Sequence, residues 1–301
     1  MGQVLVLLSA FGFATLGIFG KLAFEAGLER NAALFFRFAG ALPLMGLLIR
    51  GVAPGQRDCR VFYRAMGLGF IGIGVEATLF FVTLQHLGAA LTGVFLYLYP
   101  AFVVLLSHFF LGERMGLRKA LSVAIALAGS VLTAGVIGGG GAGMTSPLED
   151  PAGLIAGVLT GAWYAVYLLA GARMTGKSDP VWVSSGVVAG SACVFGLLFI
   201  LGRFSASPAA LPEPSVALFG VVAGLALFST ALAFSTLYAG MKRVGAVRTS
   251  MLSTFELVFT LILAWGLLGE RLTPWQVAGA FLILVSVVMT AWQGENEAYE
   301  N

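Results

Sequence analysis

The sequence predicts an all-α integral membrane protein with ten transmembrane helices in two inverted five-helix repeats. Composition is the first ground for this prediction. Of the 301 residues, 59% are hydrophobic and only 10% are charged, and the mean hydropathy is +0.96. A soluble domain carries about 25% charged residues, so a soluble enzyme is excluded. The other two grounds are the number of apolar runs and a repeat between the two halves of the chain.

Ten apolar runs are long enough to cross a bilayer, because a hydrocarbon core about 30 Å thick needs about 20 helical residues. The first run has no basic segment before it and is longer than the apolar core of a signal peptide, so we expect a first helix rather than a cleaved leader. The runs lie at 3–24, 32–49, 65–85, 89–111, 117–136, 151–172, 181–201, 215–240, 245–268 and 274–292.

Three of the predicted helices begin at an N-cap residue followed by proline, at 150–151, 179–180 and 273–274. Such a pair supplies a side-chain acceptor for the first turn and a proline at the first helical position. The run GGGGAG at 138–143 lacks the lysine and Ser/Thr of a phosphate-binding loop. We therefore expect 138–150 to be a flexible linker between the halves.

A gap-free shift of 157 residues aligns parts of the two halves and carries the repeat prediction. It places Gly88, Thr92, Gly112, Glu113, Arg114 and Thr133 on Gly245, Thr249, Gly269, Glu270, Arg271 and Thr290. Helices 4 and 5 then match helices 9 and 10, so each half has five helices. An odd number of crossings inserts the second half upside down, which is the plan of many secondary transporters. We predict a first repeat at 1–137, a second at 151–293, and an acidic cytoplasmic tail at 294–301.

The basic residues predict the orientation. Most of the 17 lysines and arginines lie on connections that share one side of the ten-helix map. By the positive-inside rule that side is cytoplasmic, which places both termini in the cytoplasm and the protein in the cytoplasmic (inner) membrane. These residues are Arg50, Arg57, Arg60, Arg64, Arg114, Arg118, Lys119, Arg173, Lys177, Lys242, Arg243 and Arg248. Topology alone explains the net charge of +3, so no nucleic-acid partner is expected.

Several motifs resemble the EamA family of the drug/metabolite transporter superfamily: LGER at 111–114 and 268–271, YPAFVVLL at 99–106, and FFRF at 35–38. The resemblance implies a ten-helix exporter of small metabolites, amino acids or drugs, with helices 5 and 10 peripheral to a central cavity. The aromatic-rich helices look most like the YddG type of exporter, which carries aromatic and other apolar amino acids. Multidrug or cationic-compound efflux is the competing substrate class. One departure is the FEL at 255–257, where the family usually has proline, so the kink expected at Pro100 is in doubt for helix 9.

Polar residues in the bilayer core tend to face the bundle interior or a water-filled cavity. In helix 9, Ser253 and Glu256 share one polar face. The shift of 157 residues aligns Glu256 with Tyr99 of helix 4, so the two residues hold equivalent positions in the repeat. Phe95 lies on the same side of helix 4 as Tyr99. We predict a polar wall and an aromatic wall on two sides of one cavity, with ordinary helix packing as the alternative.

Further candidate substrate-binding residues come from helices 2, 3, 6 and 8: Arg37, Glu76, Phe80, Thr83, Trp163, Tyr167 and Ser229. Glu76 and Glu256 could bind a substrate amino group and couple transport to protons. Arg37 could neutralise a substrate carboxylate or pair with Glu76, or instead extend to the membrane surface. Aromatic rings can hold an apolar group or an ammonium group.

Two other functional classes compete with a transporter. A lipid-modifying enzyme within the membrane would need a clustered nucleophile and base or a metal site, and no HExxH or GxSxG motif is present. A channel would share the composition, but inverted halves suit alternating access better. His86 and His108 are too scattered for a metal site, and Cys59 and Cys193 have no zinc-ligand spacing. We therefore expect a small-molecule substrate, the lipid bilayer as surroundings, and neither cofactor nor metal.

Overall fold

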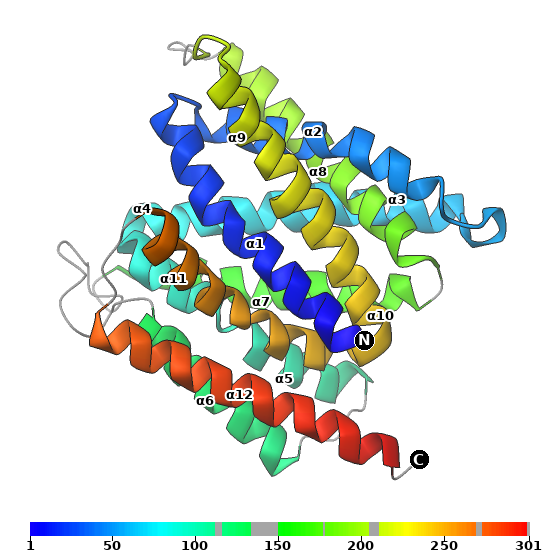
Figure 1. The fold of residues 1–301 in the computed structure, drawn as a ribbon, viewed down its shortest axis with the longest axis vertical. Coiled ribbons are helices and arrows are strands. Elements are labelled where there is room, and N and C mark those ends of the chain that lie inside the picture. Colours follow the sequence, from blue (N-terminus) through cyan, green and yellow to red (C-terminus); the bar gives the residue numbers. More distant parts are fainter. Residues whose placement is uncertain (112–115, 134–149, 177, 205–210, 269–272, 300–301) are drawn as a thin grey trace.

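A computed structural model describes residues 1–111, 116–133, 150–176, 178–204, 211–268 and 273–299, and every regular element in these ranges is a helix. In chain order these are α1 (Gly2–Glu25), α2 (Arg30–Ile49), the short η1 (Pro54–Gln56), α3 (Cys59–Gly67), the π-helical turn η2 (Leu68–Ile73), α4 (Gly74–Leu96), α5 (Tyr99–Leu111), α6 (Leu117–Thr133), α7 (Pro151–Thr175), α8 (Pro180–Arg203), α9 (Val216–Ala226), the π-helical turn η3 (Leu227–Leu232), α10 (Ala233–Ser253), α11 (Phe255–Leu268) and α12 (Pro274–Tyr299). Figure 1 shows them as one bundle.

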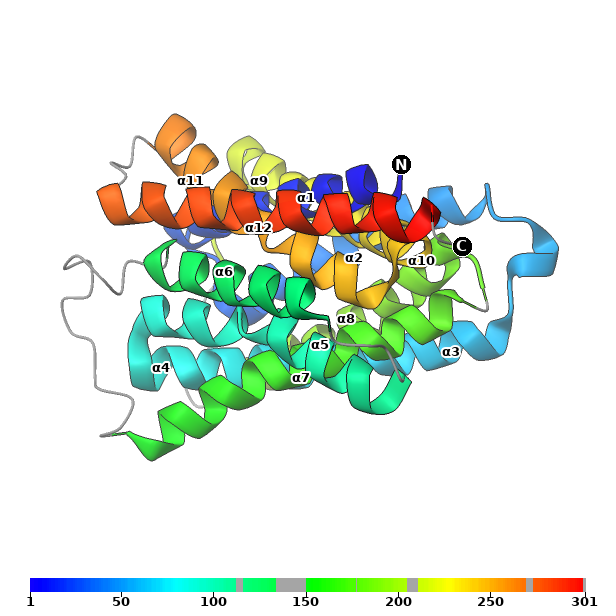
Figure 2. The same cartoon turned by 90° about the horizontal axis from the view of Figure 1, so that it is seen from below.

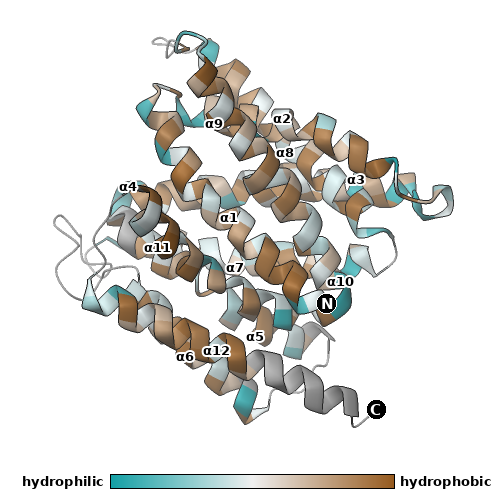
Figure 3. Ribbon diagram, viewed as in Figure 1, coloured by the Kyte–Doolittle hydropathy of each residue, from teal (hydrophilic) through white to brown (hydrophobic). Residues whose placement is uncertain are grey.

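Seven of these helical stretches are long and apolar enough to cross a membrane, and three shorter ones, Ala120–Thr133, Phe255–Leu267 and Pro274–Met289, are also apolar. Figure 3 shows apolar residues along the helices and polar residues gathered towards their ends. Two predicted boundaries were wrong. The helical stretch of the third run begins at Cys59 rather than at 65, and the last helix, α12, continues to Tyr299 rather than ending at 292.

Parts of the predicted linker and motifs lie outside the described residues. These are the glycine run at 138–143, most of the 138–150 linker, and residues 112–114 and 269–271 of the two LGER motifs.

The chain breaks its helices at two matching glycines. Gly88 and Gly245 both have φ of +79°, with ψ of 171° and 168°, a conformation that is essentially restricted to glycine. In each case the threonine four residues later donates its hydroxyl to the glycine carbonyl at 2.7 Å. These glycines are 157 residues apart, so the repeat found in the sequence has a counterpart in the backbone.

A second interruption follows each glycine. One lies between Leu96 and Tyr99, just before Pro100, and the other is the single residue Thr254 between α10 and α11. The predicted helix at 245–268 is therefore interrupted at Thr254, although it lacks the proline found in the predicted helix at 89–111. The missing proline does not prevent a break at this position.

The two halves of the chain pack into each other rather than side by side. The first helix, α1, packs on α10, α11 and η3, and the first helix of the second half, α7, packs on α4, α5 and η2. Helix α2 packs on α8. Helices α6 and α12 pack on each other at one edge of the bundle, which is visible in two perpendicular views (Figures 1 and 2). The interior of the bundle is thus shared between the halves.

Close backbone contact joins α8 to α3 and η2. A Cβ atom on Gly190 would overlap the carbonyl oxygen of Met66, and one on Gly69 would overlap the carbonyl oxygen of Val187. Small residues at such crossings let helices approach closely in a membrane. By contrast, a Cβ atom on Gly202, near the end of α8, would meet nothing within 4 Å.

This difference predicts the effect of alanine at two positions of α8. Gly190→Ala should destabilise the protein by about 1–3 kcal/mol, because the contact is with backbone and cannot relax locally. Gly202→Ala is the matched control and should leave the thermal midpoint within about 1 °C of the wild type, because surface substitutions without contacts have small effects. Thermal unfolding in detergent measures both, and equal midpoints for the two variants would contradict the packing described here.

Side chains cap three helices as the sequence predicts. Asp150 accepts a hydrogen bond from the Gly153 N–H at 3.0 Å, and Asp179 accepts one from the Val181 N–H at 2.8 Å. Thr273 and Gln276 cap α12 reciprocally, each side chain accepting from the other's backbone N–H. Asp150 also contacts the His86 ring, with Nδ1 and Oδ2 2.8 Å apart. The Gly153 N–H and then the His86 ring hold the pKa of Asp150 below its usual range.

A pH dependence of stability follows from Asp150. A carboxyl group whose pKa is lowered by folding stabilises the fold while ionised, and this stabilisation is lost as the pH falls through its folded-state pKa. Asp150→Asn should therefore be less stable than the wild type at about pH 7, and the difference should shrink below about pH 4. Thermal unfolding against pH tests this, with the exposed Glu29→Gln as control. A constant difference across the range would show that the Asp150 carboxylate contributes nothing.

Candidate functional site

A cavity of about 150 Å³ lies inside the bundle, lined by both halves of the chain. Its lining draws on the first four predicted helices of each half, and no described residue of α6 or α12 belongs to it. This arrangement agrees with the expectation that helices 5 and 10 are peripheral. The lining residues are Phe13, Leu16, Leu34, Arg37, Phe38, Ile73, Glu76, Ala77, Leu96, Tyr97, Tyr99, Tyr164, Tyr167, Phe195, Phe234 and Glu256.

Three charged side chains face this cavity: Arg37 from α2, Glu76 from α4 and Glu256 from α11. The Glu76 carboxylate has no hydrogen bond or ion pair with any other residue that the structure describes. The Tyr97 side chain is a hydrogen-bond partner of the Glu256 carboxylate. Both carboxylates therefore remain able to bind a positively charged group in the cavity.

Arg37 is buried, with 6% of its surface exposed. Its Nε donates to the Thr230 hydroxyl at 2.9 Å, and its Nη2 donates to the Ser229 carbonyl at 2.8 Å. The guanidinium also lies over the Phe38 ring, 4.8 Å from the centroid. Of the alternatives left open by the sequence, extension to the membrane surface was wrong, and no ion pair with Glu76 within 4 Å is formed.

The acceptors of Arg37 belong to a π-helical turn. Ser229 and Thr230 both lie in η3, and π-helical turns inside helices are frequent at functional sites. The other turn, η2, is held in the same way, because the Trp163 indole N–H donates to the Gly72 carbonyl at 2.9 Å. In each case the donor comes from the opposite half of the chain, so these three hydrogen bonds join the two halves.

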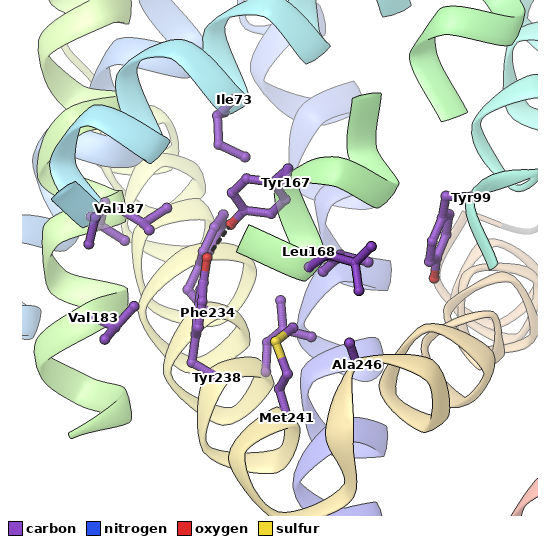
Figure 4. Packing of buried hydrophobic residues seen from close by; sticks show 14 of the residues in the cluster. Ile73, Tyr99, Tyr167, Leu168, Val183, Val187, Phe234, Tyr238, Met241 and Ala246 are labelled. Atoms are coloured by element: carbon purple, nitrogen blue, oxygen red, sulfur yellow. Dashed lines mark hydrogen bonds between the residues drawn. The ribbon is translucent and has the colours of Figure 1, made fainter. Parts of the chain in front are cut away.

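Four tyrosines line the cavity, namely Tyr97, Tyr99, Tyr164 and Tyr167. The Tyr99 and Tyr164 rings meet edge to face with centroids 4.8 Å apart, and Tyr164 stacks on Tyr167 at 5.6 Å. The Tyr99 hydroxyl donates to the Ser250 carbonyl at 3.1 Å, and the Tyr238 hydroxyl donates to the Tyr167 hydroxyl at 2.9 Å. Figure 4 shows the second bond above the buried side chains of Met241 and Val183. Tyr238 is buried and does not line the cavity, and it holds the hydroxyl of the lining residue Tyr167.

The structure brings together five of the eleven candidates from the sequence: Arg37, Glu76, Tyr99, Tyr167 and Glu256. Glu256 and Tyr99 face one cavity, as the 157-residue shift suggested. The sequence reasoning missed other aromatic lining residues, among them Tyr97, Phe195 and Phe234. On α7 the chosen Trp163 does not line the cavity, whereas its neighbour Tyr164 does.

The other six candidates do not line the cavity in this structure, and the contacts known for them are with their own helix or with a neighbouring one. They pack as follows: Phe80 against Phe81, Thr83 against Leu79 and Thr160, Phe95 over Gly157, Trp163 on Gly72, Ser229 on Thr15 and Arg37, and Ser253 beside Tyr99. A spacing of three and four residues selects one face of an unbroken helix. The helix is interrupted after Leu96 and at Thr254, so this spacing does not hold across either break. Phe95 and Ser253 therefore do not share a face with Tyr99 and Glu256, which follow the breaks.

The chemistry of the cavity suits a small amphiphile. Carboxylates and a guanidinium can bind opposite charges, and the tyrosine and phenylalanine rings can hold an apolar group or an ammonium group. An apolar protein cavity of about 150 Å³ accommodates benzene, so the volume fits a molecule with one ring. No group of three or more His, Cys, Asp and Glu side chains that could hold a metal is found in the described residues.

Comparisons with known proteins agree with this arrangement. The chain is 25% identical over 284 residues to the uncharacterized transporter YcbK of Bacillus subtilis (strain 168), covering 92% of this chain and 88% of that one. It is 24% identical over 294 residues to an uncharacterized transporter of Archaeoglobus fulgidus, covering 97% and 96%. A protein of known crystal structure has the same fold, with a TM-score of 0.76 and 22% identity over 98% of both chains.

The EamA-like transporter family model matches the chain twice, over residues 1–135 and 151–292. The two matches indicate a duplicated unit, in line with the matching glycine breaks. The family consists of multi-pass membrane transporters and not of enzymes, so the intramembrane lipid-modifying enzyme is excluded. This chain belongs to the EamA-like transporter family.

Proposed function

We propose that the protein is a secondary transporter that exports small apolar amino acids, aromatic ones above all, across the cytoplasmic membrane by alternating access. The observation that carries the proposal is the central cavity, in which two carboxylates and one guanidinium lie beside an aromatic wall. In this proposal ten helices cross the membrane as two inverted repeats, at 1–137 and 151–293, joined by the linker at 138–150. Both termini are cytoplasmic, and so is the acidic segment 294–301.

The cavity offers a partner for each part of an amino acid. Glu76 and Glu256 bind the amino group, because neither carboxylate is neutralised by an ion pair among the described residues. Arg37 binds the carboxylate through the guanidinium N–H groups that its bonds to Ser229 and Thr230 leave over. The side chain lies against Tyr99, Tyr164 and the neighbouring rings.

A second candidate is the efflux of cationic compounds, and one observation favours it. Two carboxylates face the cavity but only one guanidinium, and that guanidinium already donates two hydrogen bonds to η3. A cation without a carboxylate would satisfy the acidic residues and leave Arg37 as it is. Comparing an amino acid with its decarboxylated amine separates the two candidates.

Counterflow in liposomes tests the substrate. The purified protein should exchange labelled phenylalanine saturably, with methionine and threonine as further test substrates. Glu256→Gln should raise the KM for phenylalanine about tenfold or more, because a hydrogen bond to a charged group is worth about 1.5–3 kcal/mol. Glu25→Gln, an exposed carboxylate at the end of α1, is the matched control. Transport of 2-phenylethylamine or cationic dyes without any of the amino acids would replace this substrate class with the second candidate.

Proton coupling is tested on the same liposomes. If the two cavity carboxylates exchange protons for substrate, an imposed pH gradient should drive net phenylalanine uptake by the wild type. The double variant Glu76→Gln and Glu256→Gln should keep any residual counterflow but lose the response to the gradient, because a glutamine cannot carry a proton across. An unchanged response in the double variant would exclude coupling through these two groups.

A further inference from the structure

A second hollow, of about 300 Å³, adjoins the central cavity. It lies between the beginning of α2, the first half of α4 and the later part of α8. Leu34, Ala77 and Phe195 line both spaces, so these three side chains lie between the two spaces. The lining of the second hollow is Arg30, Asn31, Leu34, Ala77, Thr78, Phe81, Val82, Gln85, Phe195 and Leu198.

The second hollow differs from the central cavity in its charge. Arg30 is the charged group of its lining, and no acidic side chain is among the lining residues that the structure describes. The Arg30 guanidinium lies 4.3 Å from the centroid of the Phe81 ring, and its Nε donates to the Asn31 side-chain oxygen at 3.4 Å. Its Nη atoms form no hydrogen bond with another described residue. The ring therefore positions a guanidinium whose terminal donors remain available for a ligand.

Two amide side chains extend this donor set. Asn31 and Gln85 both line the hollow, and the amide of Gln85 has no hydrogen bond with another described residue. Thr78, in contrast, uses its hydroxyl on the Gly74 carbonyl at 2.8 Å. The rest of the lining is apolar. A guanidinium with adjacent amides is suited to bind a carboxylate at two points, and the apolar remainder can hold the group attached to it.

We propose that this hollow is a second binding site, which takes the carboxylate of a small apolar acid at the entrance to the central cavity. The proposal rests on the proposed function for the identity of the ligand, an amino acid with an apolar side chain. In the entrance site Arg30 holds the carboxylate first, and in the central cavity Arg37 takes over the carboxylate while Glu76 and Glu256 hold the amino group. The carboxylate of the zwitterion is thereby bound in turn by an arginine in each of two adjoining spaces.

Protection of a single cysteine tests the entrance site without requiring transport. Gln85→Cys is introduced into a chain in which the exposed Cys59 and Cys193 are replaced by serine. Labelling by a hydrophilic maleimide is followed in dodecyl maltoside without phospholipid. Benzoate and phenylalanine should each slow the labelling of this cysteine severalfold, and 2-phenylethylamine, which has no carboxylate, should not. Ala26→Cys, exposed in the α1–α2 connection, is the control position and should label at an unchanged rate.

The Arg30→Gln variant should abolish the protection by benzoate, whereas Arg50→Gln, at the opposite end of α2, should retain it. Absence of protection, or protection that survives in Arg30→Gln, would overturn the proposal. A lipid headgroup could present the same anionic chemistry, so one arm adds phosphatidylglycerol. Protection by this lipid but not by benzoate would mean a headgroup site and would also overturn the proposal.

The two proposals fail separately. If benzoate protects the cysteine but no amino acid shows counterflow, the entrance site stands as an anion site and the proposed substrate falls. If phenylalanine is carried with the same KM by the wild type and by Arg30→Gln, and benzoate gives no protection, the transporter stands and the entrance site falls.

Discussion

The buried guanidinium of Arg37 is the constraint on which the arrangement of the helices depends. A charge inside a bilayer is costly unless it is paired or hydrogen-bonded, and backbone carbonyls can supply the partners. Here the partners are the Ser229 carbonyl and the Thr230 hydroxyl, both in η3. These two hydrogen bonds join α2, from the first half, to η3 of the second half. They also keep a positive charge at the wall of the central cavity.

The Trp163 indole makes a similar contact between the halves, with the Gly72 carbonyl in η2. The two contacts are not equivalent, because Arg37 lies on the second helix of its half and Trp163 on the first helix of its half, and because one donor is charged and the other is neutral. A duplicated and intertwined chain can thereby enclose a cavity whose two sides are unlike. Carboxylates and a guanidinium lie on some helices, and tyrosines lie on others. Such asymmetry is what a carrier of an asymmetric amphiphile requires.

Interruptions of the helices mark the boundaries of the cavity. Lining residues lie at or next to the π-helical turn η2, the break between Leu96 and Tyr99, and the break at Thr254. Irregular backbone at membrane depth is tolerated where it is buried in protein or lines a cavity, and broken helices are common at transporter binding sites. Gly88 and Gly245, with nearly the same unusual backbone angles, divide α4 and α10 at equivalent points.

Much of this could be predicted from the sequence, and the reasons differ by element. Hydropathy locates the helices because a membrane requires long apolar runs, and the capping signals at Asp150, Asp179 and Thr273 depend on neighbouring residues only. The charged residues of the cavity could be chosen because ionisable groups in a membrane are rarely placed without a function. The π-helical turns could not be predicted, because they arise from contacts between distant helices such as Arg37 with Thr230. For the same reason Trp163 was assigned to the cavity although it faces Gly72.

The most direct test of this account is an experimental structure of the protein with phenylalanine bound. The account predicts ligand density in the central cavity, with the amino group within hydrogen-bonding distance of Glu76 or Glu256 and the ring against Tyr99 and Tyr164. Arg37 should still donate to the Ser229 carbonyl or have transferred a donor to the ligand carboxylate. Ligand density elsewhere in the bundle, with the central cavity filled only by side chains, would contradict the account.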